Sequence, residues 1–536
     1  MNSSLLPPCG RDTCSNASKE KSSPAARPGA VQPSTIRGWI ERAAADHGDD
    51  VCLADARGPA SLTYAQLLEV VQATGRRLAE AGLPCGARVC IRLADPLRYA
   101  AALVAVIAAG RVAVPLDPAA PDSDIARVIA VARPAGQVTE LAGQQEPAGQ
   151  RGQRAGGDRE ATPPFGISAV DLSPLTGDGP GGGIFLCTSG TTGTPKGILL
   201  REEQLAHTAA SVVEAHRLTG SDHGYCSLPL FHVNAEVVGV LATLRAGASL
   251  AVDRRFSRHG FWDIIRDRGI TWINAVPAII SILSLDPPAG PPPALRFVRS
   301  ASAPLPLAAL ERFEKAVGVP VIETYGMTEA ASMITANPLD GPRKPGSAGQ
   351  PAGSQVRIGA AADGSAGDGL PSGASAEPGE IGRVMIRGAG IITAYASGGR
   401  PGVIDDQGWL DTGDLGYLDA DGYLFLVGRS DDVINRGGEK IYPREIEEIL
   451  LAQPGVRSAA VIGAADEVLG ERPVAYVLPD AGAVPADMQE LLRAACAQQL
   501  PRHKRPSEFW LVNQMPLGPT GKLSRRLLKE SVAARS

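Results

Sequence analysis

The sequence predicts an α/β protein with a large N-terminal domain of two parallel-sheet α/β subdomains plus a small β-barrel-like subdomain, followed by a small, mobile α+β C-terminal domain. At 536 residues the chain exceeds what one hydrophobic core supports, so several domains are expected. Strand-like apolar runs alternate with helical patterns through most of the first half, which is typical of parallel sheets. After about residue 380, short strands and turns replace this alternation. We therefore expect a disordered leader over residues 1–34, an N-terminal domain over 35–428 and a C-terminal domain over 429–536.

The alternation is clearest near the start of the N-terminal domain. Thr63 and Gln66 form a capping box that predicts the start of a helix. The apolar stripe of this helix consists of Leu67, Leu68, Val71 and Leu78. The elements expected next are a strand over residues 87–93, an Ala-rich helix over Pro96–Gly110 and a strand over residues 112–118.

Segments of different composition interrupt or end this pattern. Residues 133–183 are rich in Gly, Gln and Pro and predict a flexible connection, and residues 286–294 and 359–379 predict loop-like inserts. Apolar segments between these stretches continue the buried α/β core. In the C-terminal tail a helix should begin at Pro443, a favourable first-turn residue, with Ile446, Ile449 and Leu450 on one stripe.

Composition excludes several classes of protein. A net charge of −5 and 44% apolar residues argue against a dedicated nucleic-acid binder. No apolar run reaches the roughly 18 residues of a membrane span, and the N-terminus lacks a signal-peptide pattern. The eight cysteines include no C-x-x-C pair, which argues against a zinc site or a disulfide framework. The sequence therefore predicts a cytoplasmic protein.

The stretch "CTSGTTGTPKG", Cys187–Gly197, predicts an anion-binding loop. Successive backbone N–H groups in a Gly-rich turn bind anions, hydroxyls add donors, and Lys196 adds a positive charge. The stretch does not match the G-x-x-x-x-G-K-[ST] nucleotide loop, because Pro195 stands where the second glycine is required. The alternative is a solvent loop of turn-forming residues.

Two later stretches offer groups suited to a nucleotide. In "ETYGMTEAA", Tyr325 offers a flat face for a purine, Gly326 lets the backbone approach a ligand, and Thr328 and Glu329 supply oxygens for Mg²⁺. In the Thr-Gly-Asp turn of "GWLDTGDLG", the Asp414 carboxylate can accept both hydroxyls of a ribose.

Two further stretches, "INRGGEKIYP" and "PLGPTGKLSRR", set Lys440 and Lys522 in glycine turns of a chain with few lysines. The alternative interpretation of Lys522 is a solvent-exposed charge of the C-terminal tail without a functional role, because three basic residues follow it.

The five stretches, in this order and spacing, strongly resemble the adenylate-forming superfamily of acyl-CoA synthetases, peptide-synthetase adenylation domains and luciferases. The resemblance covers residues 35–530, and the segment from Arg299 to Pro351 is most similar to small-acid and oxalate-type CoA ligases. It implies that the N-terminal domain binds AMP and that the enzyme joins a carboxylic acid to CoA. The implied ligands are the acid, ATP (or a preformed acyl-AMP), Mg²⁺ and CoA, and the implied state is a monomer or homodimer.

The resemblance also implies roles for individual residues. The nucleotide-binding set is Thr188, Ser189, Gly190, Thr191, Thr192, Gly193, Lys196, Ser302, Ala303, Tyr325, Gly326, Met327, Thr328, Asp414 and Arg429. The catalytic set is Lys522, Lys196, Thr328, Glu329 and His232, with Glu329 also the metal ligand. Asp431 falls at the hinge of a rotating C-terminal domain, and Gly437, Gly438, Glu439 and Lys440 would line the CoA channel. By itself, a histidine in an apolar run such as His232 is more often a packed core residue.

The acid is less well specified. The pocket candidates are His232, Val233, Asn234, Val237, Val238, Val276, Pro277, Gly326 and Met327. Because none of them is Arg or Lys, and because Gly326 suggests space, we expect an apolar acid that can be bulky rather than a dianion.

Four alternatives remain open. Arg201 and Glu202 replace the family's usual Thr or Ser followed by His, and a charge pair beside the phosphate loop could leave only the thioester half-reaction. A carrier protein could replace CoA as the acceptor. Luciferase-type oxidation has no supporting feature. A non-enzymatic nucleotide sensor is disfavoured because it would not need both Lys440 and Lys522.

Overall fold

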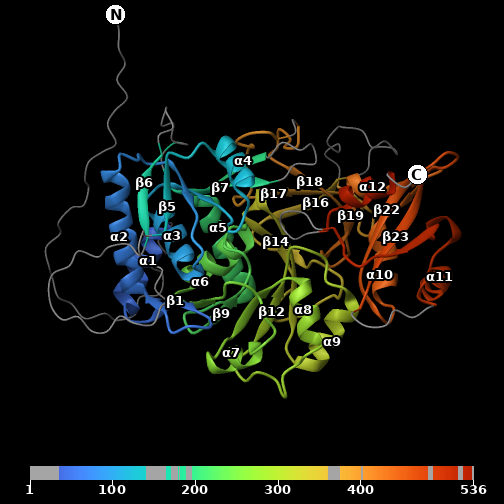
Figure 1. Ribbon diagram of the computed structural model, residues 1–536, viewed down its shortest axis with the longest axis horizontal. Coiled ribbons are helices and arrows are strands. Elements are labelled where there is room, and N and C mark those ends of the chain that lie inside the picture. Colours follow the sequence, from blue (N-terminus) through green and yellow to red (C-terminus); the bar gives the residue numbers. More distant parts are fainter. Residues whose placement is uncertain are drawn as a thin grey trace, which may run out of the picture. The chain divides into compact units, whose positions relative to one another are not determined.

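The computed structural model describes residues 35–140, 165–170, 179, 181–188, 196–359, 375–399, 402–480, 487–516 and 523–533. It confirms the predicted fold class: two mixed sheets with parallel cores, an antiparallel β subdomain and an α+β C-terminal unit (Figure 1). The predicted leader, residues 1–34, lies outside the described residues.

The first sheet has six strands in the order β6-β5-β3-β4-β7-β8. Its parallel core consists of β5 (Gly136–Thr139), β3 (Arg88–Ile91), β4 (Val112–Pro115) and β7 (Gly183–Thr188). The edges are the antiparallel strands β6 (Gly166–Ala169) and β8 (Lys196–Arg201).

The prediction of a flexible connection over residues 133–183 is wrong where β5 and β6 form. The composition of these strands did not indicate a β-strand: β5 has the sequence "GQVT" with a single buried aliphatic side chain, Val138. At the start of β5 the chain packs closely: a Cβ on Gly136 would lie 2.5 Å from Leu83 Cδ1, so the leucine would have to move. Residues 141–164 of this connection lie outside the described residues.

The second sheet has nine strands in the order β15-β14-β13-β12-β11-β9-β10-β1-β2. Its parallel strands are β13 (Val321–Met327), β12 (Phe297–Ser300), β11 (Trp272–Ala275), β9 (His223–Cys226), β10 (Ser249–Val252) and β1 (Val51–Asp55). The antiparallel strands are β15 (Gln350–Pro351), β14 (Ser332–Ala336) and β2 (Ser61–Thr63). Carboxyl ends of neighbouring parallel strands meet at one edge, where α/β proteins usually bind ligands.

Helices cover and separate these sheets. They are α1 (Ile36–His47), α2 (Tyr64–Glu80), α3 (Pro96–Ala108), α4 (Asp122–Ala132), α5 (Glu202–His216), α6 (Ala242–Ala246), α7 (Phe261–Asp267), α8 (Pro277–Ser284) and α9 (Leu307–Val317). The predicted capping box of Thr63 and Gln66 is confirmed at the start of α2. Both α3 and α5 contact strands of the two sheets, so they lie between them, which explains why α3 is buried along almost its whole length.

The β subdomain is a four-stranded antiparallel sheet. Its strands follow the order β16 (Gln355–Gly359), β17 (Gly382–Arg387), β18 (Leu410–Leu418) and β19 (Leu424–Arg429). Lys344 Nζ fastens the β18–β19 turn by ion pairs of 2.5 Å to Asp419 and 2.6 Å to Asp421.

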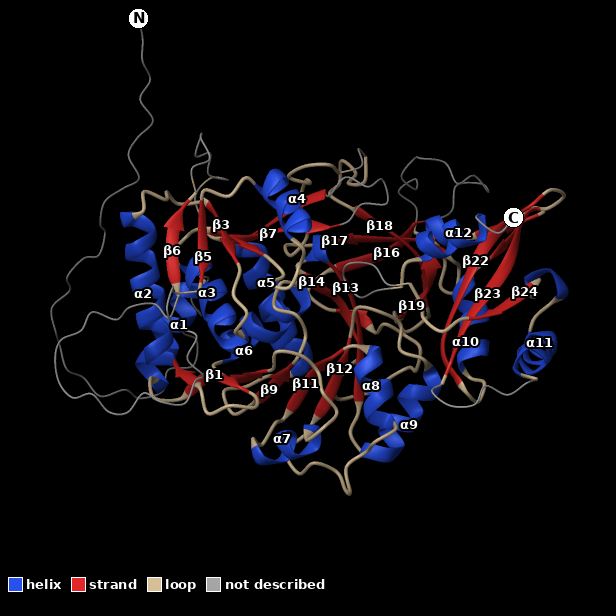
Figure 2. Cartoon of the chain, in the orientation of Figure 1, coloured by secondary structure: helices blue, strands red, loops and turns tan. Residues whose placement is uncertain are grey.

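The C-terminal sheet combines β20 (Ile434–Arg436), β21 (Glu439–Ile441), β22 (Val456–Asp466), β23 (Gly470–Pro479) and β24 (Glu508–Leu511). The surrounding helices are α10 (Pro443–Leu451), α11 (Met488–Gln499) and α12 (Arg525–Ala533) (Figure 2). Alternate residues of β22 serve two cores: Val461 packs in the cluster of α10 and α11, and Ile462 in the cluster of Leu528 on α12. The predicted start of α10 at Pro443 is confirmed. The boundary at residue 429 and the mobility of this unit remain predictions.

Candidate active site

Two strands present the predicted phosphate loop. Residues 189–195 lie outside the described residues. The strands on either side of them, β7 and β8, are described. Thr188 ends β7 and pairs with Lys196, the first residue of β8. The Lys196 Nζ atom lies 5.3 Å from the centroid of the Tyr395 ring, a cation–π distance. Strand pairing and the contact with Tyr395 thus hold Lys196 where the loop joins β8.

Tyr395 also contacts the candidate metal ligand. Glu329 lies in the short 3₁₀ helix η2 (Thr328–Ala330), where its side chain is buried. The Tyr395 Oη atom donates a hydrogen bond of 2.8 Å to Glu329 Oε1. One aromatic ring therefore links Lys196 and Glu329, which are far apart in sequence.

Backbone hydrogen bonds fix the segment that carries Tyr395. Gly197 N donates to Ser397 O, and Ile392 N donates to Glu329 O, both at 2.9 Å. The approach at Gly197 requires glycine, because a Cβ there would lie 2.5 Å from Ser397 Oγ. Sequence reasoning missed Tyr395, since nothing in "ITAYASGG" distinguishes it from a loop residue.

Three strands bring together the residues predicted for adenine and ribose. The Tyr325 Oη atom on β13 donates to Asp414 Oδ2 on β18 at 2.5 Å. Asp414 Oδ1 accepts from Arg429 Nη1 on β19 at 3.0 Å, since these two residues are directly paired across the strands. Burial raises the pKa of Asp414, while the Arg429 guanidinium and the Tyr325 hydroxyl favour its charged form. The arrangement presents a hydrogen-bonded carboxylate beside an aromatic ring.

The loop after β12 supplies two further predicted nucleotide contacts. Ser302 and Ala303 are both exposed there. Ser302 has φ of 76°, which is uncommon for a residue other than glycine and is often found at functional sites. Met327 ends β13 and Thr328 begins η2, so both lie beside Glu329.

The interpretation of Gly326 as space for the acid is wrong. A Cβ on Gly326 would lie 1.4 Å from the backbone oxygen of Ser332, because β14 folds directly against β13 at a bulge. The backbone of β14 therefore occupies the space where a side chain of residue 326 would lie, so the glycine does not make room for a ligand there.

The other predicted pocket residues cluster around a π-helix, η1 (Asn234–Leu241), a rare helix type that is frequent at functional sites. Val237 and Val238 are fully buried in it. The His232 ring is partly buried and packs edge-on against Phe231 at 4.7 Å between centroids. Val233 is partly buried before η1, and Val276 and Pro277 begin α8.

None of the predicted pocket residues is Arg or Lys, but an arginine outside that set contacts one of them. Arg299, on β12, donates a hydrogen bond of 2.7 Å from Nη1 to Asn234 Oδ1. Its side chain is only 1% exposed. Sequence reasoning missed it because Arg299 lies 65 residues from Asn234 in the chain.

The predicted hinge and CoA-channel residues lie in the C-terminal part. Asp431 is exposed in the 3₁₀ helix η3 (Ser430–Asp432), two residues after Arg429. Residues Gly437, Gly438, Glu439 and Lys440 are exposed in and after the β20–β21 turn. Both glycines need positive φ, 62° and 91°. Lys522 lies outside the described residues.

The inference that Arg201 and Glu202 lie beside the phosphate loop is wrong. Arg201 pairs with Gly183 at the opposite end of the hairpin from Lys196. Arg201 lies five positions after Lys196 along the strand, roughly 16 Å at 3.3 Å per residue. Glu202 Oε1 accepts a hydrogen bond of 2.8 Å from Ile36 N, at the start of α1. This carboxylate therefore satisfies a helix N-terminus and does not face the phosphate loop.

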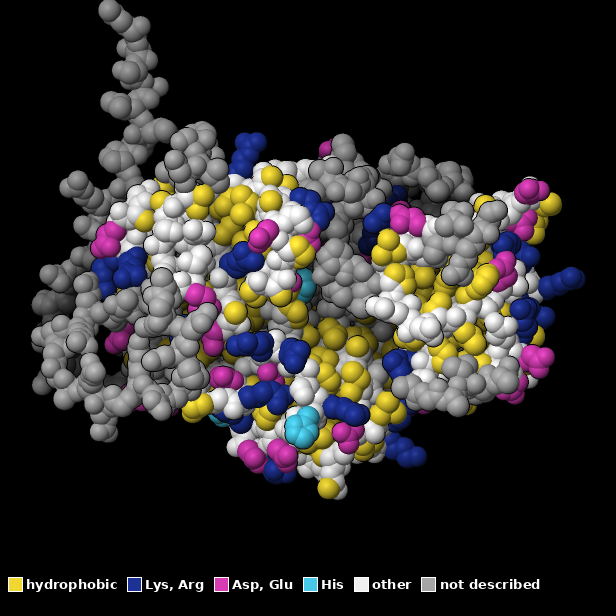
Figure 3. All heavy atoms as spheres, in the orientation of Figure 1, with side chains coloured by type: hydrophobic (Ala, Val, Ile, Leu, Met, Phe, Trp, Pro, Cys, Tyr) yellow, Lys and Arg dark blue, Asp and Glu magenta, His cyan; other side chains and the backbone are white. Residues whose placement is uncertain are grey.

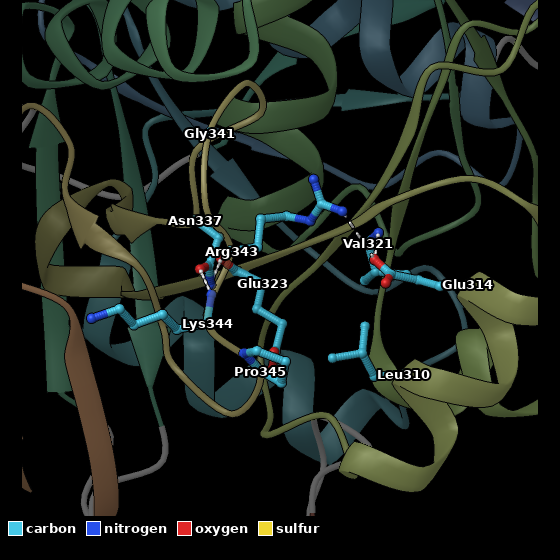
Figure 4. Close-up of a pocket in the computed structure, with 9 residues that line it drawn as sticks. All are labelled: Leu310, Glu314, Val321, Glu323, Asn337, Gly341, Arg343, Lys344 and Pro345. Atoms are coloured by element: carbon cyan, nitrogen blue, oxygen red, sulfur yellow. Dashed lines mark hydrogen bonds and ion pairs between the residues drawn. The ribbon is translucent and has the colours of Figure 1, made fainter.

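A small cavity of about 140 Å³ lies elsewhere, between α9 and the loop after β14 (Figure 4). In it Arg343 Nη2 lies 3.8 Å from Glu314 Oε1, and Asn337 Oδ1 accepts from Lys344 N at 3.2 Å. Burial raises the pKa of Glu323 to about 7. None of the predicted site residues lines this cavity.

Within the part of the chain that the structure describes, no group of three or more His, Cys, Asp or Glu side chains could hold a metal ion by itself. Glu329, with the neighbouring Thr328 hydroxyl, instead suits Mg²⁺ that arrives with a nucleotide, since Mg²⁺ commonly takes one or two carboxylates and the phosphate oxygens. Positive and negative side chains are interspersed over the face in Figure 3. None of the described helices is long and apolar enough to cross a membrane.

The chain belongs to the AMP-binding enzyme family. The model of that family matches residues 40–396, and the model of the AMP-binding enzyme C-terminal domain matches residues 445–522. The resemblance to adenylate-forming enzymes is thereby confirmed, as is the class of ATP-dependent acid–thiol ligase.

Several individual proteins are similar to the chain over most of its length. The sulfoacetate–CoA ligase of Cupriavidus necator is 36% identical over 508 residues, 92% of this chain and 96% of that protein. The oxalate–CoA ligase of Arabidopsis thaliana is 34% identical over 520 residues, 92% and 98% of the two chains. Among solved structures, ATP-bound MatB from Rhodopseudomonas palustris superposes with a TM-score of 0.78 at 26% identity, covering 93% of this chain and 99% of that one.

Proposed function

We propose that the protein activates a carboxylic acid as an acyl-adenylate and transfers the acyl group to the thiol of CoA. The observation that carries this proposal is the contact of Tyr395 with both Lys196 and Glu329. It brings the lysine of the phosphate loop and the candidate metal ligand to one place, as a reaction between a carboxylate and a polyphosphate requires.

The first step must join two anions. A carboxylate oxygen of the acid forms a bond to the α-phosphorus of ATP while the bond to pyrophosphate breaks, so like-charge repulsion has to be offset in a fixed, in-line geometry. Residues 188–193 and Lys196 hold the β- and γ-phosphates. Glu329 and Thr328 would hold Mg²⁺, which would supply positive charge to the phosphates. Lys522 approaches the acid and the α-phosphate.

The nucleoside lies between the end of β13 and strands β18 and β19 of the β subdomain. Tyr325 stacks on adenine, with Ser302, Ala303, Gly326 and Met327 along the same edge. Asp414 accepts hydrogen bonds from the ribose hydroxyls, and the Arg429 contact at 3.0 Å keeps that carboxylate charged and oriented. Tyr395 acts as a positioning residue for Glu329.

The second step breaks the adenylate with a different nucleophile. The CoA sulfur attacks the acyl carbon, AMP leaves, and the turn of Gly437, Gly438, Glu439 and Lys440 lines the approach, with His232 between the acyl pocket and the CoA channel. Because Lys522 and this turn serve different steps at one place, we propose that the C-terminal domain rotates about Asp431 between them.

Replacement of Asp431 by Pro tests the rotation. The fixed φ of proline should hinder rotation, so thioester formation should fall about tenfold more than adenylate formation. The measurement compares pyrophosphate release without CoA against thioester formation from a synthetic acyl-adenylate. Asp431→Ala is the matched control, because it removes the same exposed carboxylate without restricting the backbone. Equal loss of both partial reactions in Asp431→Pro would rule out the hinge assignment.

The function itself is tested by supplying MgATP and a panel of acids, first without and then with CoA. We expect pyrophosphate in the first case and an acyl-CoA in the second, both detected by mass spectrometry. Pyrophosphate without CoA would exclude an enzyme restricted to the thioester step, in line with the distance of Arg201 and Glu202 from the phosphate loop. Transfer to a phosphopantetheine carrier protein but not to CoA would favour a carrier-loading enzyme. ATP binding without turnover of any acid would favour a nucleotide sensor.

A further inference from the structure

One end of the β22–β23 hairpin holds the turn that is predicted to line the CoA channel. That turn, residues 437–438, joins β20 to β21. Gly437 N donates a hydrogen bond of 2.7 Å to Leu469 O, between β22 and β23. Arg436 at the end of β20 is paired with Gly470, the first residue of β23. Two backbone contacts therefore seat the turn against the hairpin.

A carboxylate on the hairpin also reaches the turn, through a second residue. Glu471 Oε2, on β23, accepts a hydrogen bond of 2.8 Å from Asn435 N. The Asn435 side chain in turn accepts a hydrogen bond of 3.1 Å at Oδ1 from Gly438 N. The carboxylate therefore fixes Asn435, and Asn435 fixes the second residue of the turn.

Glycine at position 463 leaves room for this carboxylate. Glu471 is paired with Ala465 on β22, and Gly463 lies two residues from Ala465 on the same face of that strand. A Cβ on Gly463 would lie 2.7 Å from Glu471 Oε1 and 3.0 Å from Glu471 Cδ. A side chain at position 463 would therefore push the Glu471 carboxylate away from its present place.

The turn is held in place although it adds nothing to the hydrophobic core. Gly437, Gly438, Glu439 and Lys440 are all exposed, and the two glycines have no side chain to bury. Ordering exposed backbone costs conformational entropy, and here no apolar burial offsets it. A ligand that binds an already ordered turn avoids this cost. The hydrogen bonds from the hairpin therefore favour binding at the turn more than folding.

We propose that Glu471 is a positioning residue for the acceptor thiol. Through Asn435 it holds the turn of Gly437 and Gly438 in the conformation that CoA contacts during the second step. This proposal rests on the proposed function and adds a residue that none of the predicted site sets contains. Glu471 acts only through the turn, so the first step, which uses Lys522 in its place, does not depend on it.

Glu471→Ala tests this role by comparing the two partial reactions. In thioester formation from a synthetic acyl-adenylate, kcat/KM for CoA should fall at least tenfold, the usual value of a hydrogen bond to a charged group. Pyrophosphate release without CoA should stay within about twofold, with the acid of the panel that releases pyrophosphate fastest. Glu471→Gln should recover most of the loss, because its amide oxygen can accept from Asn435 N.

Gly463→Ala is the sharpest variant, because it displaces the carboxylate without removing it. The three atoms nearest to the new methyl group all belong to the Glu471 carboxyl group, the end of a flexible side chain. Alanine suits a strand interior better than glycine, so the midpoint of thermal unfolding should not fall. The value of kcat/KM for CoA should fall nearly as far as in Glu471→Ala. The double variant should be no worse than Glu471→Ala alone, since the methyl group then displaces nothing.

Glu467→Ala is the matched control. It removes an exposed carboxylate from the same hairpin, four residues before Glu471, so kcat/KM for CoA should not change. Unchanged CoA dependence in Glu471→Ala, equal losses in both partial reactions, or additive losses in the double variant would overturn the proposal while leaving an active ligase. The absence of thioester formation by the wild-type protein would instead count against the proposed function.

Discussion

Replacing Glu329 by Gln should lower the rate of pyrophosphate release about 10²- to 10³-fold, the usual effect of removing a group that stabilises developing charge. Glutamine keeps the shape of the side chain and can still accept the 2.8 Å hydrogen bond from Tyr395. The change therefore removes the negative charge that Mg²⁺ requires and little else. The measurement is pyrophosphate release at saturating acid, with Mg²⁺ titrated from limiting to excess.

Tyr395→Phe is the companion to this variant. It keeps the ring over Lys196 and removes the hydroxyl that orients Glu329, so we expect a smaller loss, about tenfold, and a higher Mg²⁺ requirement. A merely structural tyrosine would change the thermal stability and not the Mg²⁺ dependence. Wild-type rates for Glu329→Gln at every Mg²⁺ concentration would contradict its assignment as the metal ligand.

Replacing Gly326 by Ala should destabilise the protein strongly, by about 4 kcal/mol or more, which is exceptional for one methyl group. The new Cβ would lie 1.4 Å from the Ser332 oxygen, so β13 and β14 could not remain paired as they are. The neighbouring backbone has little freedom to relax, because Ala331 and Ser332 already have positive φ, 49° and 105°. Denaturant unfolding measures the loss, and nucleotide affinity should fall with it because Tyr325 is the adjacent residue.

Gly290→Ala is the matched control. A Cβ there meets nothing within 4 Å, so its effect on the free energy of unfolding should be within about 0.5 kcal/mol. If Gly326→Ala unfolded at the same denaturant concentration as the wild type, β14 would have to lie farther from β13 than the structure places it.

The sequence predicted local features well because they depend on nearby residues. The capping box of Thr63 and Gln66 and the proline at the start of α10 are both present, since a cap involves residues within one turn. The short strand β5 was missed because its partners, not its composition, hold it in the sheet. The π-helix η1 was also missed, since the apolar run that forms it fits an α-helix equally well.

In the candidate site, too, the sequence revealed the residues of local motifs and missed those whose partners are distant in the chain. Motifs identified Lys196, Glu329, Asp414 and Arg429, and the structure brings them into two contacting groups. No local pattern could reveal Tyr395 or Arg299, because their partners lie 66 and 65 residues away. The same limit misled the interpretations of Arg201 and Gly326, whose neighbours are set by strand pairing, and of Glu202, whose partner Ile36 lies 166 residues away.

The backbone bonds of Gly197 and Ile392 join the phosphate loop and the Glu329 turn to one short segment, residues 392–397. Most of the predicted acyl-pocket residues lie on other elements, at the start of η1 and at the start of α8. We therefore expect substitutions at the start of η1, such as at Val237, to change the choice of acid without disturbing the ATP end. The chain offers a starting point for engineered ligases in which new acids are recruited to an unchanged activation chemistry.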